Sequence, residues 1–526
     1  MKIEANNLPG DVVGCHALIA ELVRELDVRD RRLRQLQHQV EQLLRWRYGQ
    51  KRERVDENQL FFEALAAIQA EVRVPPANEE PAAQTAPVEE KSVKRHTPHG
   101  RGRLPKNLER RRVVYDLTAE QQHCPHCAET MRHIGEEVSE RLEYVPASLY
   151  VIEEVTQTYA CPKGCTVVTA GKPMAPIEKG LPGPGLLAHV AVSKYADHLP
   201  LARQEGMFRR QGVELARSTL CDWMRRGAEL LDPLYRLMQQ HVLRSHAVQT
   251  DDIPVPVFDP EMTRTRTGRI WTYLGDAEHP YTVYDYTPTH SHEGPAAFLD
   301  TFAGYLQADA YSGYDSIYQD EDRDVTEVAC WAHARRKFFD AQSTDLMRSM
   351  IMLAYVRLLY DVEREAKQQS LDAEARLVLR QHKSVPLLDG IERYLRAEQP
   401  KVLPKSPVAE AIGYVLGNWE ALKRYTEDGD LQIDNNGAER SLRGIAVGRR
   451  NWMFYGSDRG GQTAAILTSF TATCKRLHID PFAYLRDVFE RISAHPAKRL
   501  AELLPDQWQL RQTQGKQMAH TTPDTS

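Results

Sequence analysis

The sequence has no long apolar run. Its first residues, MKIEANNLPGDVVG, lack the apolar core that a secretory signal needs. The most apolar later stretch, residues 350–360, is short and contains Arg357, which is not typical of a membrane span. We therefore expect a cytoplasmic protein.

An excess of positive charge is also missing. The 68 lysines and arginines are outnumbered by 73 acidic residues, which gives a net charge of −5. The overall charge therefore does not indicate a nucleic-acid partner, and such an indication has to come from local clusters. With 526 residues the chain is too long for one hydrophobic core, so we expect several domains.

Cysteine is scarce, but four of the eight cysteines are grouped. Cys124 and Cys127 form one pair, and Cys161 and Cys165 form a second pair further along the chain. In a reducing compartment, closely spaced thiolates favour a tetrahedral zinc site over disulfides. Four unrelated buried cysteines are the alternative.

The N-terminal segment has a leucine-rich periodicity. Apolar residues recur in alternating steps of three and four from Ile19 to Leu43, with Arg29 at one of these positions. This spacing predicts a short coiled coil that joins copies of the chain, although a solvated amphipathic helix fits it too. Residues 71–100, with PPANEEPAAQTAP, have the composition of a disordered linker, and basic residues follow up to position 112.

A helical pair and a strand-rich region follow the cysteines. A helix from about Leu199 to Arg210, a turn at Gly212 and a helix capped by Ser218 match the helix-turn-helix pattern. Many helical hairpins with this pattern bind no DNA. The strands AVQTDDIPVPVF, RIWTYLGD and YTVYDYTP come next, then a helix, two more strands and a basic helix, an order that predicts an α/β sheet.

A second helical region interrupts this sheet domain. Residues 343–426 are rich in leucine, alanine, glutamate and arginine, with breaks expected near Pro386, Pro400, Pro404 and Pro407. Two helices then close the sheet domain. We therefore expect a multidomain α/β protein with a coiled coil (1–70), a disordered basic linker (71–112), a zinc-binding module (113–170), a helix-turn-helix-like region (171–243), a catalytic core in two parts (244–342 and 429–505), an all-helical insertion between them (343–428) and a disordered tail (506–526).

Three acidic residues are candidates for a metal site. Asp251 lies on the first strand, Asp309 at the end of the fourth, and Glu439 in an arginine-rich segment near the C-terminus. Carboxylates that meet at a strand edge suit Mg²⁺ or Mn²⁺, and two such ions clamp both reacting oxygens of a phosphodiester displacement. Like charges so close need cations between them to stay ionised together.

Each of these acids also has a structural explanation. Asp251 and Asp252 are neighbours on a strand, so they point to opposite faces and only one reaches a shared metal. Asp309 is a residue type that starts turns. Glu439 follows Asn436 by three residues, which is the spacing of a capping box with Asn436 as the N-cap. On their own, the residues support a metal-dependent phosphoryl-transfer domain.

Basic and aromatic side chains accompany the acids. The basic ones are candidates for DNA phosphate contacts, with intramolecular ion pairing as the alternative. They are His333, Arg335, Arg336, Arg440, Arg443, Arg449 and Arg450. Trp452 and Tyr455 are either core residues or stack on a frayed base, and we expect the glycine-rich loop of residues 456–461 to let DNA approach closely.

Several motifs resemble those of the insertion-sequence-sixty-six family of bacterial transposases. They are SERLEYVPASLYVIEEV, LPLARQEGMFRRQGVELARSTLCDWM, LQADAYSGY, CWAHARRKF and DNNGAERSLRGIAVGRRNWMFYGSDRGG. The resemblance extends from the leucine-rich N-terminus to about Leu504. It implies a DDE transposase with a ribonuclease-H-like core, a zinc-binding module and a helical insertion before the final glutamate.

The family's acidic triad falls on Asp251, Asp309 and Glu439. Where the family usually has Asp-Glu-Thr-Pro at the first acid, this chain has DDIP, which leaves the role of the missing threonine hydroxyl open. The resemblance implies two Mg²⁺ or Mn²⁺ ions on the triad and Zn²⁺ on the four cysteines. Water activated by one ion would release a 3′-OH, which then attacks target DNA.

The partners implied by the resemblance are the ends of the mobile element and the target DNA. A homo-oligomer through the coiled coil is expected, and accessory proteins of the element are candidate partners. Two other functions stay open at this point. One is a nuclease or resolvase on the same fold that does not join strands, and the other is a non-catalytic zinc-dependent DNA-binding regulator.

Overall fold

The computed structural model describes residues 23, 24, 29, 149–154, 158–160, 167–169, 174–178, 180–261 and 264–511. The chain divides into two compact units, Pro76–Ala170 and a larger one that comprises Met1–Pro75 and Gly171–Ser526. In the smaller unit, β1 (Thr158–Ala160) and β2 (Val167–Thr169) form an antiparallel pair. The predicted coiled coil, apart from three of its residues, and the linker, the four paired cysteines and the C-terminal tail after residue 511 lie outside the described residues.

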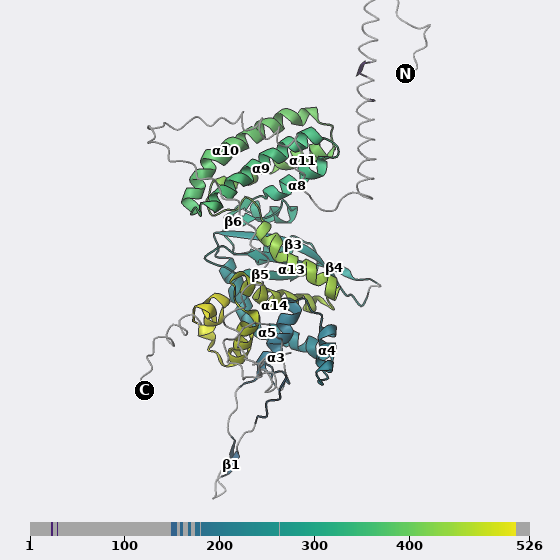
Figure 1. Ribbon diagram of the computed structural model, residues 1–526, viewed down its shortest axis with the longest axis vertical. Coiled ribbons are helices and arrows are strands. Elements are labelled where there is room, and N and C mark those ends of the chain that lie inside the picture. The colour runs from purple at the N-terminus through teal and green to yellow at the C-terminus, as the bar shows by residue number, and fades with distance from the viewer. Residues whose placement is uncertain are drawn as a thin grey trace, which may run out of the picture. The chain divides into compact units, whose positions relative to one another are not determined.

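A five-stranded sheet lies at the centre of the larger unit, in the order β5-β4-β3-β6-β7 (Figure 1). Strands β3, β4 and β5 are antiparallel, whereas β6 and β7 run parallel to β3. The strands are β3 (Ala247–Val257), β4 (Arg266–Leu274), β5 (Thr282–Thr287), β6 (Gly304–Gln307) and β7 (Val325–Val328). The predicted mixed α/β sheet is confirmed. Strand β6 is shorter than expected and ends before Asp309.

Helices make up most of the larger unit. They are α3 (Pro184–Tyr195), α4 (Leu201–Arg210), α5 (Arg217–Val242), α6 (Glu293–Phe298), α7 (Asp315–Tyr318), α8 (Trp331–Ala341), α9 (Leu346–Gln368), α10 (Ala373–Glu398), α11 (Pro407–Gly417), α12 (Trp419–Lys423), α13 (Asn436–Trp452), α14 (Asp458–Arg476) and α15 (Pro481–Arg491). Short 3-10 helices are η1 (Ser312–Tyr314), η2 (Gln399–Lys401), η3 (Arg424–Thr426), η4 (Ile492–Ala494) and η5 (Ala497–Leu503).

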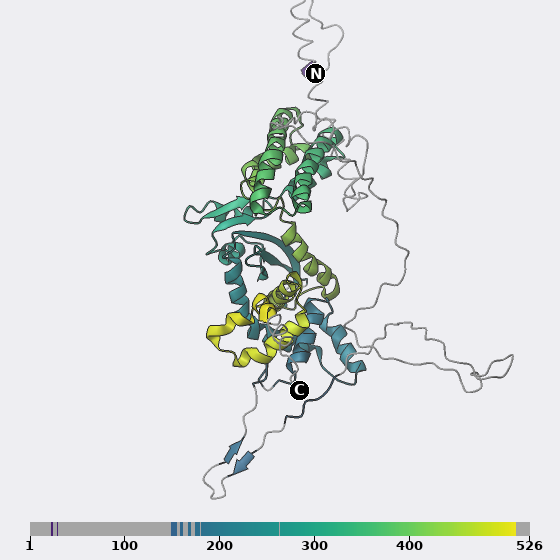
Figure 2. The ribbon, with the colours of Figure 1, turned by 60° about the vertical axis from the view of Figure 1, so that its left-hand side comes forward.

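The two faces of the sheet bury different side chains. Val248 and Trp271 pack into one core with helices α3, α5, α14 and α15. Val255 and Ile270 point to the other face and pack against Leu442 of α13. The strict alternation of strand side chains produces this division, because successive residues of β3 face opposite sides. Figure 2 shows α13 lying along the sheet, with α14 beside it.

Helix α14 also covers the edge strand β5. The backbone N–H of Tyr284 donates to the Ser469 hydroxyl at 2.8 Å, and that of Thr282 donates to the Thr473 hydroxyl at 3.0 Å. An uncovered edge strand exposes such groups to other chains. The hydroxyl residues of the segment TSFTAT therefore satisfy the edge within the molecule.

Helices α9, α10, α11 and α12 lie between β7 and α13, in the part of the sequence where we expect a helical insertion (Figure 1). Its apolar residues share a core with α8 and the end of β7, so it packs on the β7 side of the sheet. The expected break at Pro386 is wrong, because Pro386 lies inside the continuous helix α10. Among Pro400, Pro404 and Pro407, the first lies in η2 and the last begins α11.

The predicted helical pair before the sheet is α4 and α5. The expected Ser218 cap is wrong: α5 begins at Arg217, its N-cap is Ala216, and no side chain caps it. Helix α5 buries residues along its whole length, including Trp223 and Leu234. Its half-buried Arg225 is paired with Asp222 and Glu229. A DNA-reading role for this helix therefore stays a prediction. No helix in the described ranges is long and apolar enough to cross a membrane.

Candidate active site

Strand β3 places Asp251 and Asp252 on opposite faces of the sheet. Asp251 pairs in register with Thr272, whose hydroxyl lies 2.9 Å from the Ser441 hydroxyl of α13. Asp252 pairs with Trp271 and accepts from Arg269 at 2.8 Å. Its other oxygen lies 3.3 Å from His290 Nε2. Asp251 therefore belongs to the α13 face, whereas Asp252 forms an ion pair with Arg269 on the other face, although both aspartates line the pocket described below.

The neighbouring strand brings Asp309 to the same level as Asp251. Strands β3 and β6 are parallel, and Gln249 pairs with Gln307. Their side chains point the same way, because Gln249 Nε2 donates to Gln307 Oε1 at 3.0 Å. Asp251 and Asp309 each lie two residues beyond this pair, Asp251 within β3 and Asp309 just after the end of β6. This juxtaposition depends on register and is not visible in the sequence.

The chain that enters α13 is held against this same edge. Gln249 Nε2 donates to the Asp434 carbonyl at 3.2 Å, and Asn435 Nδ2 donates to the Thr250 carbonyl at 3.2 Å. Gly437 lies so close to Gln249 that a side chain there would collide with it. These contacts place the first turn of α13, and with it Glu439, over the N-terminal half of β3.

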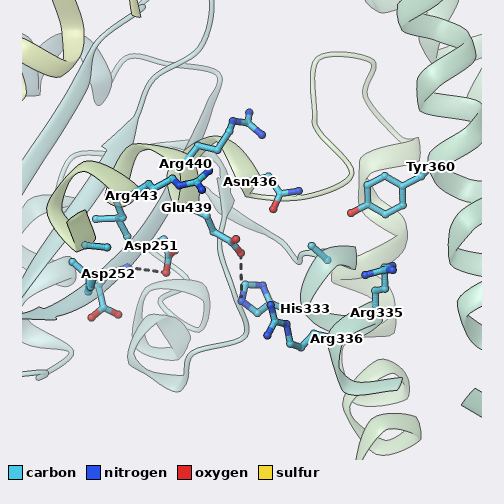
Figure 3. A pocket seen from close by; sticks show the side chains of 14 residues that line it. Asp251, Asp252, His333, Arg335, Arg336, Tyr360, Asn436, Glu439, Arg440 and Arg443 are labelled. Atoms are coloured by element: carbon cyan, nitrogen blue, oxygen red, sulfur yellow. Dashed lines mark hydrogen bonds and ion pairs between the residues drawn. The ribbon is translucent and has the colours of Figure 1, made fainter. Parts of the chain in front are cut away.

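The expected capping box at this helix is wrong by one residue. Asn435 is the N-cap, and Asn436 is the first helical residue, whose side chain donates to Asp434 at 2.6 Å. Glu439 therefore is not in the position that closes a capping box. Its carboxylate instead points at His333, with Glu439 Oε1 lying 3.6 Å from His333 Nε2 (Figure 3).

Burial and mutual repulsion disfavour ionisation of the two aspartates. Burial raises the pKa of Asp251 to about 7, the backbone N–H of Asp252 opposes this shift, and the nearby Asp309 and Glu439 add to it. Burial also raises the pKa of Asp309, and the nearby His333 opposes this shift. A cation bound between these groups would favour their charged forms.

A second set of ligand atoms meets at Glu439. In the described part of the chain, Cys330, His333 and Glu439 are a group of three whose ligand atoms all lie within 4.8 Å of one another. The three predicted acids are not such a group, because their ligand atoms do not all lie within 4.8 Å of one another, although the charges of Asp309 and Glu439 affect the pKa of Asp251. Burial raises the pKa of the Cys330 thiol to about 12, which favours the neutral thiol.

These elements enclose an open pocket with a volume of about 910 Å³. Its charged lining comprises Asp251, Asp252, Glu439, His333, Arg335, Arg336, Arg440 and Arg443. Figure 3 shows acids from β3 and α13 together with basic side chains from α8 and α13. Such a pocket combines groups suited to divalent ions with groups suited to phosphates.

The six predicted DNA-binding arginines do not all lie here. Arg335, Arg336, Arg440 and Arg443 line the pocket, whereas Arg449 and Arg450 do not. Arg449 donates to the Pro254 carbonyl at 2.6 Å, which is the intramolecular role that the sequence left open. Burial lowers the pKa of Arg335.

Sequence reasoning missed Tyr360, which lines the pocket from the helical insertion. Its hydroxyl donates to Asp434 Oδ2 at 2.7 Å, across 74 residues of sequence. It also missed Asn435, whose side chain is fully buried and whose Oδ1 has no hydrogen-bond partner in the described residues. Neither a tyrosine nor an asparagine indicates a functional site by itself, and in the sequence only the segment DNN (residues 434–436) lies within a motif that indicates one.

The structure decides between the two alternatives for Trp452 and Tyr455, and it corrects the expectation about residues 456–461. Trp452 and Tyr455 stack on each other with ring centroids 4.4 Å apart, and Tyr455 is buried, so they take the core role. Residues 456–461 are not an open loop, because α14 begins at Asp458 and Ser457 caps it. A side chain at Gly461 would collide with the ring of Tyr286, so this glycine is explained by packing.

Four family models match the chain. Residues 179–463 match a model described as "Transposase IS66 family", and residues 469–505 match "IS66 C-terminal element". Residues 121–164 match "zinc-finger binding domain of transposase IS66", and residues 35–113 match "Transposase C of IS166 homeodomain". The zinc-finger match includes the first three of the four paired cysteines and ends just before Cys165.

Curated proteins of Sinorhizobium fredii are similar over most of their length. One, named uncharacterized protein y4hP, is 35% identical over 502 residues, which is 90% of this chain and 88% of that protein. Another, y4jD, is 33% identical over 77% of this chain and 82% of its own length. A third, y4qI, is 34% identical over 71% of both.

Proposed function

This chain belongs to the IS66 family of transposases, and from that premise we propose that Asp251, Asp309 and Glu439 bind divalent ions and catalyse DNA strand cleavage and transfer. The observation that supports the proposal is that Asp251 and Glu439, far apart in sequence, line one pocket together with basic side chains. Asp309 does not line this pocket, but its charge adds to the raised pKa of Asp251. The strand order, three antiparallel strands followed by two parallel ones, supports a ribonuclease-H-like core.

The chemistry of the donors fits Mg²⁺ or Mn²⁺. Carboxylate oxygens are the ligands these ions prefer, and the raised pKa of Asp251 reports a negative charge that is poorly compensated by the chain. Ions held there supply the Lewis acidity that activates a water or a 3′-OH and stabilises the charge of the reacting phosphate. The carboxylates have to move closer together around such ions, because their oxygens do not yet form one compact group.

The other pocket residues have separate tasks in this proposal. His333 holds the Glu439 carboxylate from the opposite side of the pocket. Arg336, Arg440 and Arg443 bind the DNA phosphates that flank the reacting one, since guanidinium groups pair with phosphate oxygens. Tyr360 fixes Asp434 and thereby the start of α13.

The N-terminal half contributes DNA binding and assembly. The zinc-finger match supports Zn²⁺ on Cys124, Cys127, Cys161 and Cys165, and DNA as the partner. The leucine-rich heptads support a homo-oligomer. Cys124→Ser should lower the zinc content by about one ion per chain in a metal analysis of the purified protein, whereas exposed Cys221→Ser should leave it unchanged.

The proposed reaction is tested with labelled duplexes that carry the inverted repeats bordering this gene. Wild-type protein with Mg²⁺ should cut at the repeat and join a pre-cut 3′-OH end to a second duplex. Glu439→Gln should reduce both reactions at least about a thousandfold, as expected for losing a metal ligand, with end binding kept. The matched control is Glu427→Gln, an exposed acid outside the pocket.

Two results separate this proposal from its rivals. Cleavage without joining would make the protein a nuclease or resolvase. Binding with no metal-dependent cleavage by the wild-type chain would make it a DNA-binding regulator. Cleavage retained by Glu439→Gln would show that the proposed triad is wrong.

A further inference from the structure

One face of α13 carries a row of arginines that leads away from the pocket. Arg440, Arg443 and Arg450 are exposed, and spacings of three and seven residues align them along a helix. None of the three has a hydrogen bond or ion pair within the described part of the chain. Arg440 and Arg443 line the pocket, and Arg450 lies near the other end of the helix.

An exposed pair of aromatic rings lies at that other end. The Phe258 and Phe454 rings have centroids 6.2 Å apart, and these residues are 48% and 43% exposed. Met453 between the helix and Phe454 is exposed as well, as is Val447 in the arginine row. Single exposed apolar residues are ordinary, but a group beside unpaired cations marks an interaction surface.

The backbone holds this pair in a fixed and strained arrangement. Met453 has φ 63° and ψ −53°, and Phe454 N–H donates to the Trp452 carbonyl at 2.8 Å. This is a classic γ-turn, a rare and strained conformation for a residue with a side chain. The N–H of Phe258 donates to the Tyr455 carbonyl at 2.7 Å, so the backbone of Phe258 is bonded to the residue that follows Phe454.

The packing of Trp452 and Tyr455 explains why the ring of Phe454 stays exposed. Trp452 and Tyr455 stack on each other in the core beneath, and Tyr286 meets Tyr455 edge to face. The γ-turn directs Phe454 away from this stack, although it lies between the two core aromatics in sequence. The fold thus maintains two exposed rings that it has no internal need to expose.

The length of α13 sets the distance between the acids and the aromatic pair. From Glu439 to Trp452 the helix rises about 20 Å at about 1.5 Å per residue. A DNA duplex advances about 3.4 Å per base pair, so about six base pairs span this distance. A duplex with a phosphate at the acids therefore reaches the two phenylalanines when it follows the arginine row.

We propose that the row of Arg440, Arg443 and Arg450 is a track for duplex DNA, and that Phe258 and Phe454 contact an unstacked base about six base pairs from the reacting phosphate. The partner's identity as DNA rests on the proposed function. Cations that follow the backbone and aromatic rings that receive bases are the general means of binding distorted or unpaired DNA. Apolar side chains inserted at a base step also bend the duplex.

The proposed contact of Phe258 and Phe454 with an unstacked base, called the aromatic wedge below, is tested by DNA binding alone, without added divalent ions. The probes are a fluorescent 30-base-pair duplex and the same duplex with a three-nucleotide mismatched bubble, compared by anisotropy. Wild-type protein should bind the bubble about tenfold more tightly, because the cost of unstacking is already met. Phe258→Ala and Phe454→Ala should each remove most of this preference, whereas Val378→Ala, an exposed apolar residue of α10, should keep it.

The track is tested with the same two probes over a range of salt concentrations. Arg450→Ala should weaken binding of both DNAs equally and lower the salt dependence by about one released ion. The matched control is Arg396→Ala, an exposed arginine of α10 that pairs with Glu392. Equal effects of Arg450→Ala and Arg396→Ala would show that Arg450 does not contact the DNA.

Three results would overturn the aromatic wedge. The first is equal binding of both probes by the wild-type protein, and the second is a preference for the bubble that survives Phe258→Ala and Phe454→Ala together. The third is that these substitutions change the oligomeric state measured by light scattering and leave the preference intact, which would make the patch an interface between copies of the chain. Glu439→Gln should keep the preference, so failure of the wedge and failure of the proposed chemistry are separate results.

Element-end DNA and flanking DNA offer the same base chemistry. A 2-aminopurine placed six positions to either side of the cut distinguishes them, because this base brightens when it is unstacked. A rise on one side only, absent in Phe454→Ala, identifies which duplex follows the track. No rise on either side contradicts an unstacked base at this distance.

Discussion

The helical insertion and the pocket both bury charged groups, but they treat them differently. In the insertion, Arg380 is completely buried, and its guanidinium donates five hydrogen bonds, to the Glu363 carboxylate and to the carbonyls of Tyr425, Asp428 and Leu431. In the pocket, Asp251 accepts one backbone hydrogen bond and faces two other acids. The chain compensates the first charge itself and leaves the second to be compensated by something it binds.

This difference separates charges that stabilise the fold from charges that serve a function. A buried charge without a partner costs free energy, so a protein keeps one where a ligand uses it. Asp252 makes the same point at close range, because it forms an ion pair with Arg269 one residue away from Asp251. Four substitutions measure the contrast on the metal-free protein.

The largest loss is expected for Arg380→Ala. It leaves the half-buried Glu363 and three backbone carbonyls without their donor, which should lower the free energy of unfolding by about 3–5 kcal/mol. Urea denaturation followed by circular dichroism measures this change. A loss below about 1 kcal/mol would show that water replaces the guanidinium and that the pair is not a structural charge.

A smaller loss is expected for Asp252→Asn. This change removes the negative partner of Arg269, whose hydrogen bond to Asp252 spans 2.8 Å, and should cost about 1.5–3 kcal/mol. The same urea titration measures it. Unchanged stability would mean that the two neighbouring aspartates are not treated differently by the fold.

The opposite sign is expected for Asp251→Asn. The folded state binds the Asp251 proton more tightly than the unfolded state, since its pKa is about 7 in the fold. Its stability contribution is therefore present at low pH and is lost as the pH rises from about 4 through about 7. At pH 8 without metal, Asp251→Asn should stabilise the chain by about 1–2 kcal/mol.

Melting temperatures of the two proteins across this pH range check the sign. The difference between Asp251→Asn and wild type should grow from pH 4 to pH 7, and excess Mn²⁺ should reverse it by stabilising the wild type alone. A difference that shrinks with rising pH would contradict the assignment of Asp251 as an uncompensated charge.

The smallest effect is expected for Lys383→Ala. Its ion pair with Glu365 lies on the surface of the insertion, where solvent screens both groups, and should be worth less than about 1 kcal/mol. It is the control for Arg380 in the same urea titrations. A loss as large as that of Arg380→Ala would mean that burial does not decide these energies.

The sheet was predictable because its signal is local. Segments such as RIWTYLGD alternate or are rich in β-branched and aromatic residues, and turn-forming residues bound them. The acids were identified as candidates from the same segments and the family resemblance. The choice between Asp251 and Asp252 was not predictable, because Pro254 and Pro256 interrupt the pattern and both faces of β3 are covered.

The other features that could not be predicted from the sequence depend on contacts between distant segments. Asn435 and Asn436 are equally good caps, and the carbonyl of Thr250 selects Asn435 for the position before the helix. Trp452, Phe454 and Tyr455 are close in sequence, whereas Phe258 is distant from them. Phe258 reaches Phe454 because its backbone bonds to Tyr455, a pairing that no local sequence pattern indicates. Tyr360 reaches the pocket from an insertion whose composition indicates only helix.

The most direct test of the central claim is to locate the divalent ions. Anomalous diffraction from Mn²⁺ in crystals of the protein bound to an element-end duplex would show them. We expect two peaks, both in the pocket next to Asp251, Asp309 and Glu439, which would hold the ions. A peak at Cys330 and His333 with none at Asp251 would contradict it.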